Sequence, residues 1–181
     1  YQHQPFLEEQ IKSRRYSLVS IAKTVLMPMG LYSQKLRSIQ EIPDHAIIAI
    51  PNDPTNEGRA LLLLEKLGLI KLKNHANPTF LDIIENPKKV KIKELEAPNL
   101  AITLPDVTAA VINTDWVVLA GINPKEALAS ESIDSPYVNI MVVRKDFEND
   151  EDIKKFVKIY QSHTIKEFIV QTFKGSVIPA W

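Results

Sequence analysis

The sequence contains no cysteine, which excludes several kinds of chemistry at once. Disulfide frameworks, thiolate metal sites and cysteine nucleophiles all require a residue that this chain does not have. A cysteine-free chain is compatible with an extracytoplasmic protein but does not require one. This absence therefore leaves the cellular compartment open.

Glycine is scarce as well, with five residues among 181. Phosphate cradles depend on glycine-rich backbone, and the chain has no Walker loop, no G-x-G-x-x-G pattern and no G-x-S-x-G elbow. Classical nucleotide binding is therefore disfavoured. A Ser–His–Asp triad stays open, because its members need not be close in sequence, but no serine stands in a turn that would present it as a nucleophile.

The remaining side chains do not indicate a metal or a cofactor. Zinc and di-iron sites use characteristic spacings of histidines and carboxylates, which this sequence does not show. We therefore expect no metal and no cofactor. The candidate polar residues form a set of binding groups rather than an acid, a base and a nucleophile, so we also expect no catalytic residue and no enzymatic activity. The four histidines are scattered along the chain, at His3, His45, His75 and His163.

The chain also has neither an excess of one charge nor a long apolar run. Lys and Arg together number 22, as do Asp and Glu, so no broad basic field favours nucleic acid or an anionic membrane. The leucines of residues 61–64 are followed by Glu65 and Lys66, so this run is too short to cross a bilayer. The chain begins at Tyr1 rather than at Met, which favours a processed or truncated product.

The most informative stretch is residues 46–69, AIIAIPNDPTNEGRALLLLEKLGL. Its apolar start predicts a strand, and its leucine-rich end predicts a helix. Asp53 suits the N-cap position, Pro54 the first helical position and Gly68 the position just beyond the helix. The sequence therefore predicts a strand, a sharp turn and a helix with two defined ends.

Asn56 and Arg59 lie three residues apart near the start of this helix, so both project from one face. Free backbone N–H groups and the positive end of the helix dipole gather at the same end. This arrangement suits a carboxylate. In the alternative interpretation, Arg59 is simply solvated or pairs with a neighbour such as Glu57, since arginine is mildly unfavourable at a helix N-terminus.

A second junction between a strand and a helix follows at residues 107–121. The run VTAAVI, residues 107–112, is typical of a buried parallel strand, and Thr114 can cap a helix that ends before Gly121. Asn113 then lies at the carboxyl end of a strand, where open α/β sheets bind ligands. The alternative is a turn asparagine that hydrogen-bonds its own loop.

The rest of the chain predicts a mixture of strands and helices. Residues 16–32 are β-prone with a bend at 27–30, which indicates either a crossing between domains or an edge strand with a bulge. Residues 137–144 form a candidate second crossing, and residues 90–94 a half-exposed strand whose lysines face solvent. Helices are expected at residues 6–11, 79–85, 152–160 and 165–173.

Several stretches of the chain resemble, in order and spacing, the NlpA-type methionine-binding lipoproteins of bacterial ABC importers. The opening YQHQPFL is similar to the family's Y/F-Q-H-x-P-Y-L segment, with Phe6 where tyrosine is usual. The resemblance covers the whole chain, and its P-N-D-P-x-N-E-G-R-A-L motif is quite specific. The other matching stretches are IAIPNDPTNEGRALLLLEKLGLIKLK, ENPKKVKIKELEA, VTAAVINTDW, DSPYVNIMVVR and GSVIPAW.

The resemblance implies a two-lobed, periplasmic-binding-protein-like (type II-like) α/β fold that closes on one free amino acid, usually methionine. Residues 34–136 are expected to form one complete lobe, and residues 1–33 and 137–181 to belong to the other. Family members carry a substantial N-terminal region before the Y-Q-H segment. The second lobe is therefore expected to be truncated, with exposed strand edges and an exposed core face.

The same resemblance implies roles for individual residues. Arg59 would bind the α-carboxylate of the ligand through a bidentate fork. Amide groups for the ammonium and carboxylate would come from Asn56, Asn113 and Asn139. Aromatic rings that wrap a thioether side chain would come from Tyr1, His3 and Phe6. Trp116 is expected to pack rather than to bind.

The implied partners are methionine or a close analogue and the membrane subunits of an ABC transporter, with no nucleic acid. The full-length protein is expected in the periplasm or on the outer face of the cell membrane, held by a lipid anchor upstream of this sequence. A small-molecule-sensing or enzymatic domain that reuses the bilobal fold is the alternative, and an interaction module with a vestigial pocket is a third interpretation. The residues do not discriminate between L-methionine, D-methionine and a methionyl dipeptide.

Overall fold

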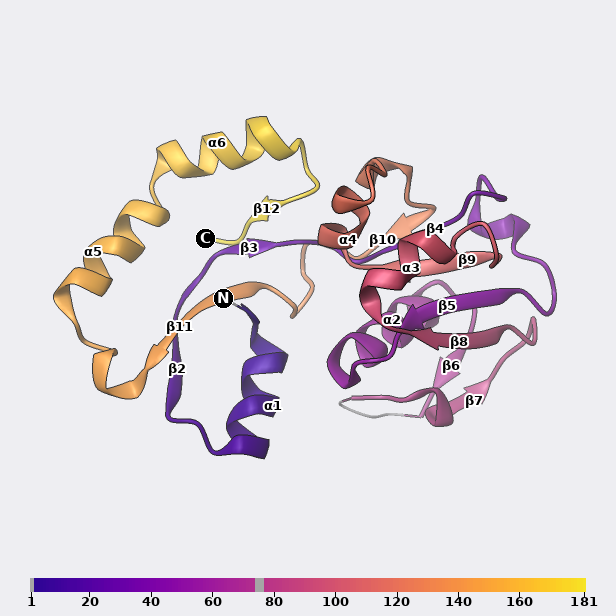
Figure 1. Ribbon diagram of the computed structural model, residues 1–181, viewed down its shortest axis with the longest axis horizontal. Coiled ribbons are helices and arrows are strands. Elements are labelled where there is room, and N and C mark those ends of the chain that lie inside the picture. Colours follow the sequence, from indigo (N-terminus) through magenta and orange to yellow (C-terminus); the bar gives the residue numbers. More distant parts are fainter. Residues whose placement is uncertain (1, 74–76) are drawn as a thin grey trace. The chain divides into compact units, whose positions relative to one another are not determined.

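The chain forms two compact units, shown in Figure 1 as a computed structural model that describes residues 2–73 and 77–181. Unit 1 comprises Tyr1–Pro28 and Ser132–Trp181, and unit 2 comprises Met29–Glu131. The first crossing falls inside the bend expected at residues 27–30. Both divisions lie a few residues before the lobe boundaries expected after residues 33 and 136.

Unit 2 is built on a five-stranded mixed sheet in the order β10-β4-β9-β5-β8. Strand β5 pairs in parallel with β8 and β9, whereas β4 is antiparallel to β9 and β10. The strands predicted at residues 90–94 and 107–112 are confirmed to within two residues, and β9 is buried along its whole length. The strand bounds are Gly30–Tyr32 for β4, Ile47–Pro51 for β5, Lys91–Leu95 for β8, Ala109–Ile112 for β9 and Ala129–Ser130 for β10.

Helix α2 (Pro54–Lys66) follows β5 directly, and both of its predicted ends are confirmed. At its start, the Asp53 side chain accepts a hydrogen bond from the backbone N–H of Asn56 at 3.1 Å. At its end, Gly68 adopts φ +72°, a conformation that costs glycine little. The backbone N–H groups of Gly68 and Leu69 donate back into the last helical turn, which closes a Schellman motif.

Helices cover both faces of this sheet, because alternate residues of a strand point to opposite sides. Ile48 and Ile50 of β5 pack in one core cluster with three leucines of α2, at positions 61, 63 and 64. Ala49, between them, packs in a second cluster with side chains from α3 (Ala97–Thr103) and α4 (Thr114–Leu119). Unit 2 is therefore a three-layer α/β/α structure in which the three central strands of the sheet are almost entirely buried.

The prediction of a helix at residues 79–85 is wrong. The structure instead has a single 3₁₀ turn, Phe80–Asp82, followed by strand β7 (Ile83–Glu85). Strand β7 pairs antiparallel with β6 (Lys71–Leu72). A neighbouring strand is available for the two isoleucines of β7, and this tertiary pairing overrides the local helix-start signal.

Unit 1 contains an antiparallel three-stranded sheet in the order β1-β11-β2. The β-prone run predicted at residues 137–144 forms its central strand, β11 (Asn139–Arg144). The outer strands are β1 (Gln2–His3) and β2 (Leu18–Lys23). A second, shorter pairing joins β3 (Val25–Leu26) to β12 (Ile178–Pro179).

Helix α1 (Gln4–Arg14) follows β1 and extends beyond the predicted residues 6–11 at both ends. Pro5 lies inside its first turn rather than in a loop before it. This position tolerates proline because the first helical N–H groups have no partner within the helix.

Helices α5 (Glu151–Tyr160) and α6 (His163–Phe173) confirm the two helices predicted near the C-terminus. The buried core that α6 joins is small and consists of Val25, Ile169 and Val177. None of the ten residues of α5 is buried, and Phe156 is 59% exposed. This agrees with the expectation of an exposed core face in this part of the chain.

Short 3₁₀ turns complete the structure at Ile39–Glu41, Phe80–Asp82, Pro124–Glu126 and Lys145–Phe147. Within residues 2–73 and 77–181, no helix has the length and apolar character that crossing a membrane requires.

Candidate functional site

Arg59 lies on α2 and is almost completely buried, with 4% of its side chain exposed. Its Nε and Nη2 groups donate to the two carboxylate oxygens of Glu131, at 2.7 Å and 2.5 Å. Glu131 is itself 9% exposed, and its Oε2 also accepts the backbone N–H of Met29 at 2.9 Å. The structure therefore pairs Arg59 through a bidentate fork with a residue 72 positions further along the chain.

Glu57, which was the alternative partner for Arg59, has a different role. Its Oε1 accepts the backbone N–H of Phe80 at 2.9 Å, which ties α2 to the 3₁₀ turn. Burial raises the pKa of the Glu57 carboxyl above its ordinary value, and neighbouring carboxylates add to this rise. Glu57 therefore anchors a loop.

A chain of three polar side chains links the start of α2 to the end of β9. Asn56 Nδ2 donates to both oxygens of Asp53, at 3.1 Å and 3.0 Å. A carboxylate can only accept, so the amide of Asn56 must turn its Oδ1 away, and this oxygen accepts from Asn113 Nδ2 at 3.1 Å. Asn113 is the last residue of this hydrogen-bonded series, and its own Oδ1 is left without a donor from Asn56.

Asn113 Oδ1 is a buried acceptor without a hydrogen-bond partner in the part of the chain that the structure describes. Asn113 is the N-cap residue of α4, but its side chain makes no cap hydrogen bond. The alternative, an asparagine that bonds its own loop, is wrong, because the side chain reaches Asn56 on a different element. An unpartnered buried oxygen is costly, so this atom indicates a place for a donor on a ligand.

The candidate residues of unit 1 gather around β1 and β11. His3 and Asn139 are opposite each other in the antiparallel register. His3 caps α1, since its Nδ1 accepts the backbone N–H of Phe6 at 3.2 Å. The His3 ring also lies edge-on to the rings of Phe6 and Tyr137, with centroids 6.1 Å and 5.4 Å apart. These contacts form an aromatic cluster of His3, Phe6 and Tyr137.

Asn139 has a structural role through its backbone. Its carbonyl oxygen accepts from both the N–H and the hydroxyl of Thr24, each at 2.8 Å. These bonds hold β11 beside the chain between β2 and β3.

The structure thus brings the predicted residues together in two groups. Unit 2 holds Asn56, Arg59 and Asn113, whereas unit 1 holds His3, Phe6 and Asn139. Tyr1 lies outside the described residues. Trp116 packs against the second core cluster of unit 2, as expected.

Two residues that contact these groups, Glu131 and Tyr137, were not among the predicted site residues. Tyr137 lies within the DSPYVNIMVVR stretch, beside Asn139, so its place in a family-like segment could have drawn attention to it. Glu131 sits in an ordinary polar loop, and nothing near it in sequence indicates a buried arginine as its partner.

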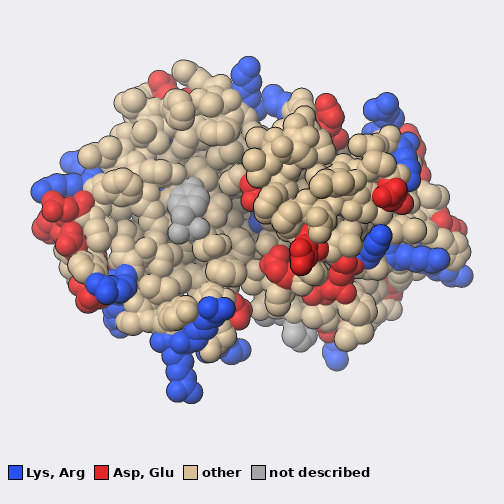
Figure 2. All heavy atoms as spheres, viewed as in Figure 1, with Lys and Arg blue, Asp and Glu red and all other residues tan. Residues whose placement is uncertain are grey.

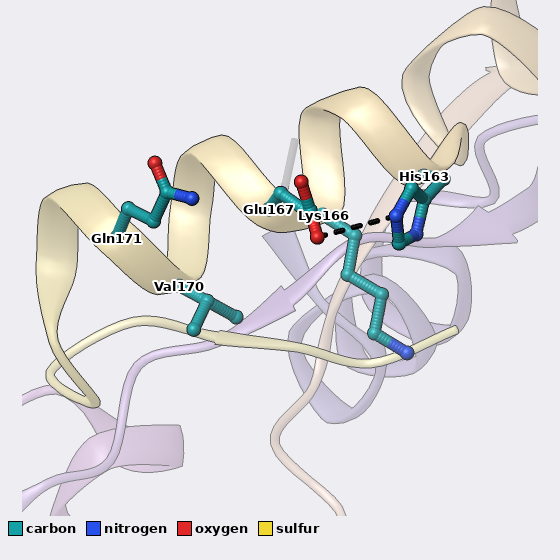
Figure 3. Close-up of a pocket in the computed structure, with 5 residues that line it drawn as sticks. All are labelled: His163, Lys166, Glu167, Val170 and Gln171. Atoms are coloured by element: carbon teal, nitrogen blue, oxygen red, sulfur yellow. Dashed lines mark ion pairs between the residues drawn. The ribbon is translucent and has the colours of Figure 1, made fainter.

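Two surface hollows on unit 1 contain none of the predicted site residues. Figure 3 shows one of about 320 Å³ along α6, where His163 pairs with Glu167 at 3.2 Å. Both side chains of this pair are more than half exposed, which is typical of a solvated helix face. The other hollow, of about 400 Å³, is lined mainly by apolar side chains of β2, β11 and α5.

Metal binding and broad electrostatic attraction find no support in the described residues. No group of three or more His, Asp and Glu side chains among them is placed to hold a metal ion, and His75 lies outside this part of the chain. Figure 2 shows both basic and acidic side chains on the visible face, separated by broad areas that carry neither.

Comparison with known proteins decides the family. The sequence profile of the NlpA lipoprotein family matches residues 1–181. The chain belongs to this family. Two relatives, from Salmonella typhi and Escherichia coli strain K12, are both named D-methionine-binding lipoprotein MetQ and are 48% and 46% identical to this NlpA-family chain. Each match covers all of this chain and 69% of the relative.

Solved structures of similar proteins support the same assignment and show the periplasmic-binding-protein-like fold. A nutrient-binding protein from Burkholderia cenocepacia, bound to methionine, is 49% identical with a TM-score of 0.94. The substrate-binding protein of a methionine transporter from Streptococcus pneumoniae is 39% identical with a TM-score of 0.90. These matches cover 99% of the NlpA-family chain and 77% and 74% of the two solved chains.

Proposed function

We propose that this NlpA-family protein is the substrate-binding component of a bacterial ABC importer and that it captures methionine or a close analogue. It works without chemical conversion, on the periplasmic side or the outer face of the cell membrane, and it passes the ligand to the transporter's membrane subunits. A lipid anchor holds the full-length protein at the membrane. The names of the relatives and the similar structures support this proposal.

The observation that carries the proposal is the orphaned Oδ1 of Asn113. Within unit 2, Asn113 is hydrogen-bonded to Asn56, which lies one helical turn before Arg59. The α-ammonium of an amino acid supplies the donor that Asn113 Oδ1 lacks, and its carboxylate is the natural partner of a guanidinium. The start of α2 therefore offers an acceptor for the ammonium, and we propose that the ligand carboxylate meets the guanidinium that Glu131 already holds.

We further propose that the aromatic cluster of unit 1 serves the ligand side chain. The rings of His3 and Phe6 offer aromatic faces that suit a polarisable thioether, and Tyr1 would add a third ring. Asn139, opposite His3 in the sheet, would contribute its amide.

Isothermal titration calorimetry with methionine tests the proposal. Asn113→Ala removes the orphaned acceptor, and Arg59→Ala removes the carboxylate partner. Losing a charge-assisted hydrogen bond weakens binding by about tenfold to a hundredfold, so we expect at least this loss in each variant. The control is Lys125→Ala, which removes an exposed cation of unit 2 and should leave the affinity unchanged.

The result that contradicts the assignment is equal methionine affinity in Lys125→Ala and Arg59→Ala. Separate titrations with L-methionine, D-methionine and a methionyl dipeptide identify the preferred ligand.

A further inference from the structure

The charges around Arg59 are nearly compensated before any ligand is considered. Glu131 neutralises the guanidinium through two hydrogen bonds and is fixed by the backbone of Met29 as a third partner. Asp53 adds a further carboxylate at the start of the same helix, where it caps α2 and orients Asn56. Arg59, Glu131 and Asp53 together carry one positive and two negative charges, and the N-terminal dipole of α2 offsets part of the negative excess.

We propose that Glu131 is a positioning residue that makes this site select a zwitterion over a simple carboxylate anion. The inference rests on the proposed function, because it concerns how the amino-acid site discriminates between ligands. Glu131 acts through Arg59: it holds the plane of the guanidinium and cancels its charge.

The physical reason is the cost of an uncompensated charge in a buried place. An arginine without a counter-ion attracts any carboxylate, with or without an amino group. With Glu131 in place, adding a second carboxylate leaves a net negative charge, which is expensive away from water. The α-ammonium of the ligand restores the balance, and Asn113 Oδ1 is the acceptor that receives it.

The hydrogen-bond chain makes this acceptor specific. Asp53 determines the orientation of the Asn56 amide, and Asn56 in turn determines that of Asn113. Because each step pairs a donor with an acceptor, Asn113 cannot turn its N–H₂ group toward the ligand without breaking its bond to Asn56. The site thus combines a neutralised arginine with a fixed acceptor.

The test uses three ligands that share the thioether side chain and differ in charge. They are methionine, its deaminated analogue 4-(methylthio)butanoic acid, and its decarboxylated analogue 3-(methylthio)propylamine. Dissociation constants are measured by calorimetry for the wild-type chain and for Glu131→Gln. The matched control is Glu126→Gln, which removes the same charge from an exposed residue of unit 2.

We expect the wild-type chain to bind methionine at least about tenfold more tightly than the deaminated acid. Glu131→Gln should reduce this preference by about tenfold, because the arginine becomes a net cation that tolerates an anion. Glu131→Asp keeps the charge and should keep the preference even if it weakens both ligands. Glu126→Gln should leave the preference unchanged.

If Glu131 has a merely structural role, Glu131→Gln lowers the affinities for methionine and for the deaminated acid by the same factor. This result overturns the inference. If circular dichroism shows that Glu131→Gln does not fold, the wild-type ligand series decides. The inference requires the amine to bind at least as tightly as the acid, and the reverse order overturns it.

The outcomes separate the two proposals. If the wild-type chain binds methionine and its preference does not respond to Glu131, only the inference fails. If the wild-type chain binds no amino acid at all, the proposed function fails and the inference fails with it.

Discussion

At the scale of single residues, unit 2 buries charged groups that are each held for an identifiable reason. Arg59 and Glu131 form a fork that leaves both nearly inaccessible to water. Taking two such charges out of water costs about as much as their attraction returns, so the pair contributes little net stability. Its effect is a fixed geometry, which is what the proposed contact between the guanidinium and a ligand carboxylate requires.

Burial of the Glu57 carboxylate disfavours its charged form, although the backbone N–H of Phe80 donates to it. Its raised pKa means that the folded chain binds a proton more readily at this position than the unfolded chain does. The stability that this group contributes is therefore present below the ordinary glutamate pKa. It is lost as the pH rises through the higher pKa of the folded state.

We therefore expect Glu57→Gln to flatten part of the pH dependence of stability. Glutamine keeps an acceptor for the Phe80 N–H but carries no charge. The variant should gain free energy of unfolding relative to wild type as the pH rises past the ordinary glutamate pKa, and urea denaturation from pH 4 to pH 7 measures the gain. Glu126→Gln provides a control at an exposed position, and a constant difference between Glu57→Gln and wild type at every pH would contradict the prediction.

At the scale of elements, α2 has an N-cap that stabilises the helix and also carries two residues of the candidate site, Asn56 and Arg59. Asp53 caps the helix and also orients the amide of Asn56, so one side chain serves both the fold and the proposed ligand position. A capping residue elsewhere in the chain, Ser162 at the start of α6, serves only the fold, since its hydroxyl accepts the N–H of Ile165. These two caps form a natural pair for comparison.

Removing each cap should separate the two effects. We expect Asp53→Ala and Ser162→Ala each to lower the free energy of unfolding by about 1 kcal/mol, the usual cost of a lost N-cap. Asp53→Ala should also weaken methionine binding, because Asn56 and Asn113 lose their fixed orientation. Urea denaturation measures the free energy of unfolding of both variants, and calorimetry measures their methionine affinity. If Asp53→Ala and Ser162→Ala change the affinity equally, Asp53 acts only through stability.

Local sequence signals predicted α2, β8 and β9 because each of these elements carries its own determinants. The cap, the proline and the terminal glycine of α2 all lie within a few residues of the helix. The failure at residues 79–85 has the opposite cause: strand β7 forms through pairing with β6, which the local sequence does not contain.

The candidate site divides in the same way. The three-residue spacing of Asn56 and Arg59 predicted that both lie on one face of the helix. The hydrogen bond between Asn56 and Asn113 forms because β5 and β9 are parallel neighbours, so the residues that follow the two strands lie at the same edge of the sheet. The partner of Arg59 could not be predicted, since Glu131 is 72 residues away and reaches α2 only through the fold.

At the scale of the whole molecule, the two units differ in how much apolar surface they bury. Unit 2 contains two core clusters, one on each face of its sheet. The core cluster of unit 1 has three buried members, and α5 adds no buried residue to it. Because burial is the main favourable term in folding, unit 1 should open more readily than unit 2.

Hydrogen–deuterium exchange resolves this difference along the chain. Backbone amides of α5 should exchange faster than those of β9, since all four residues of β9 are buried at the centre of a sheet whereas Phe156 and Ile159 of α5 are 59% and 66% exposed. Peptides from β5 provide an internal reference for the slowest exchange. Saturating methionine at a hundred times its dissociation constant should add about 2.7 kcal/mol of protection where opening requires ligand release. Equal exchange in α5 and β9 without ligand would show that the two units open as one cooperative body.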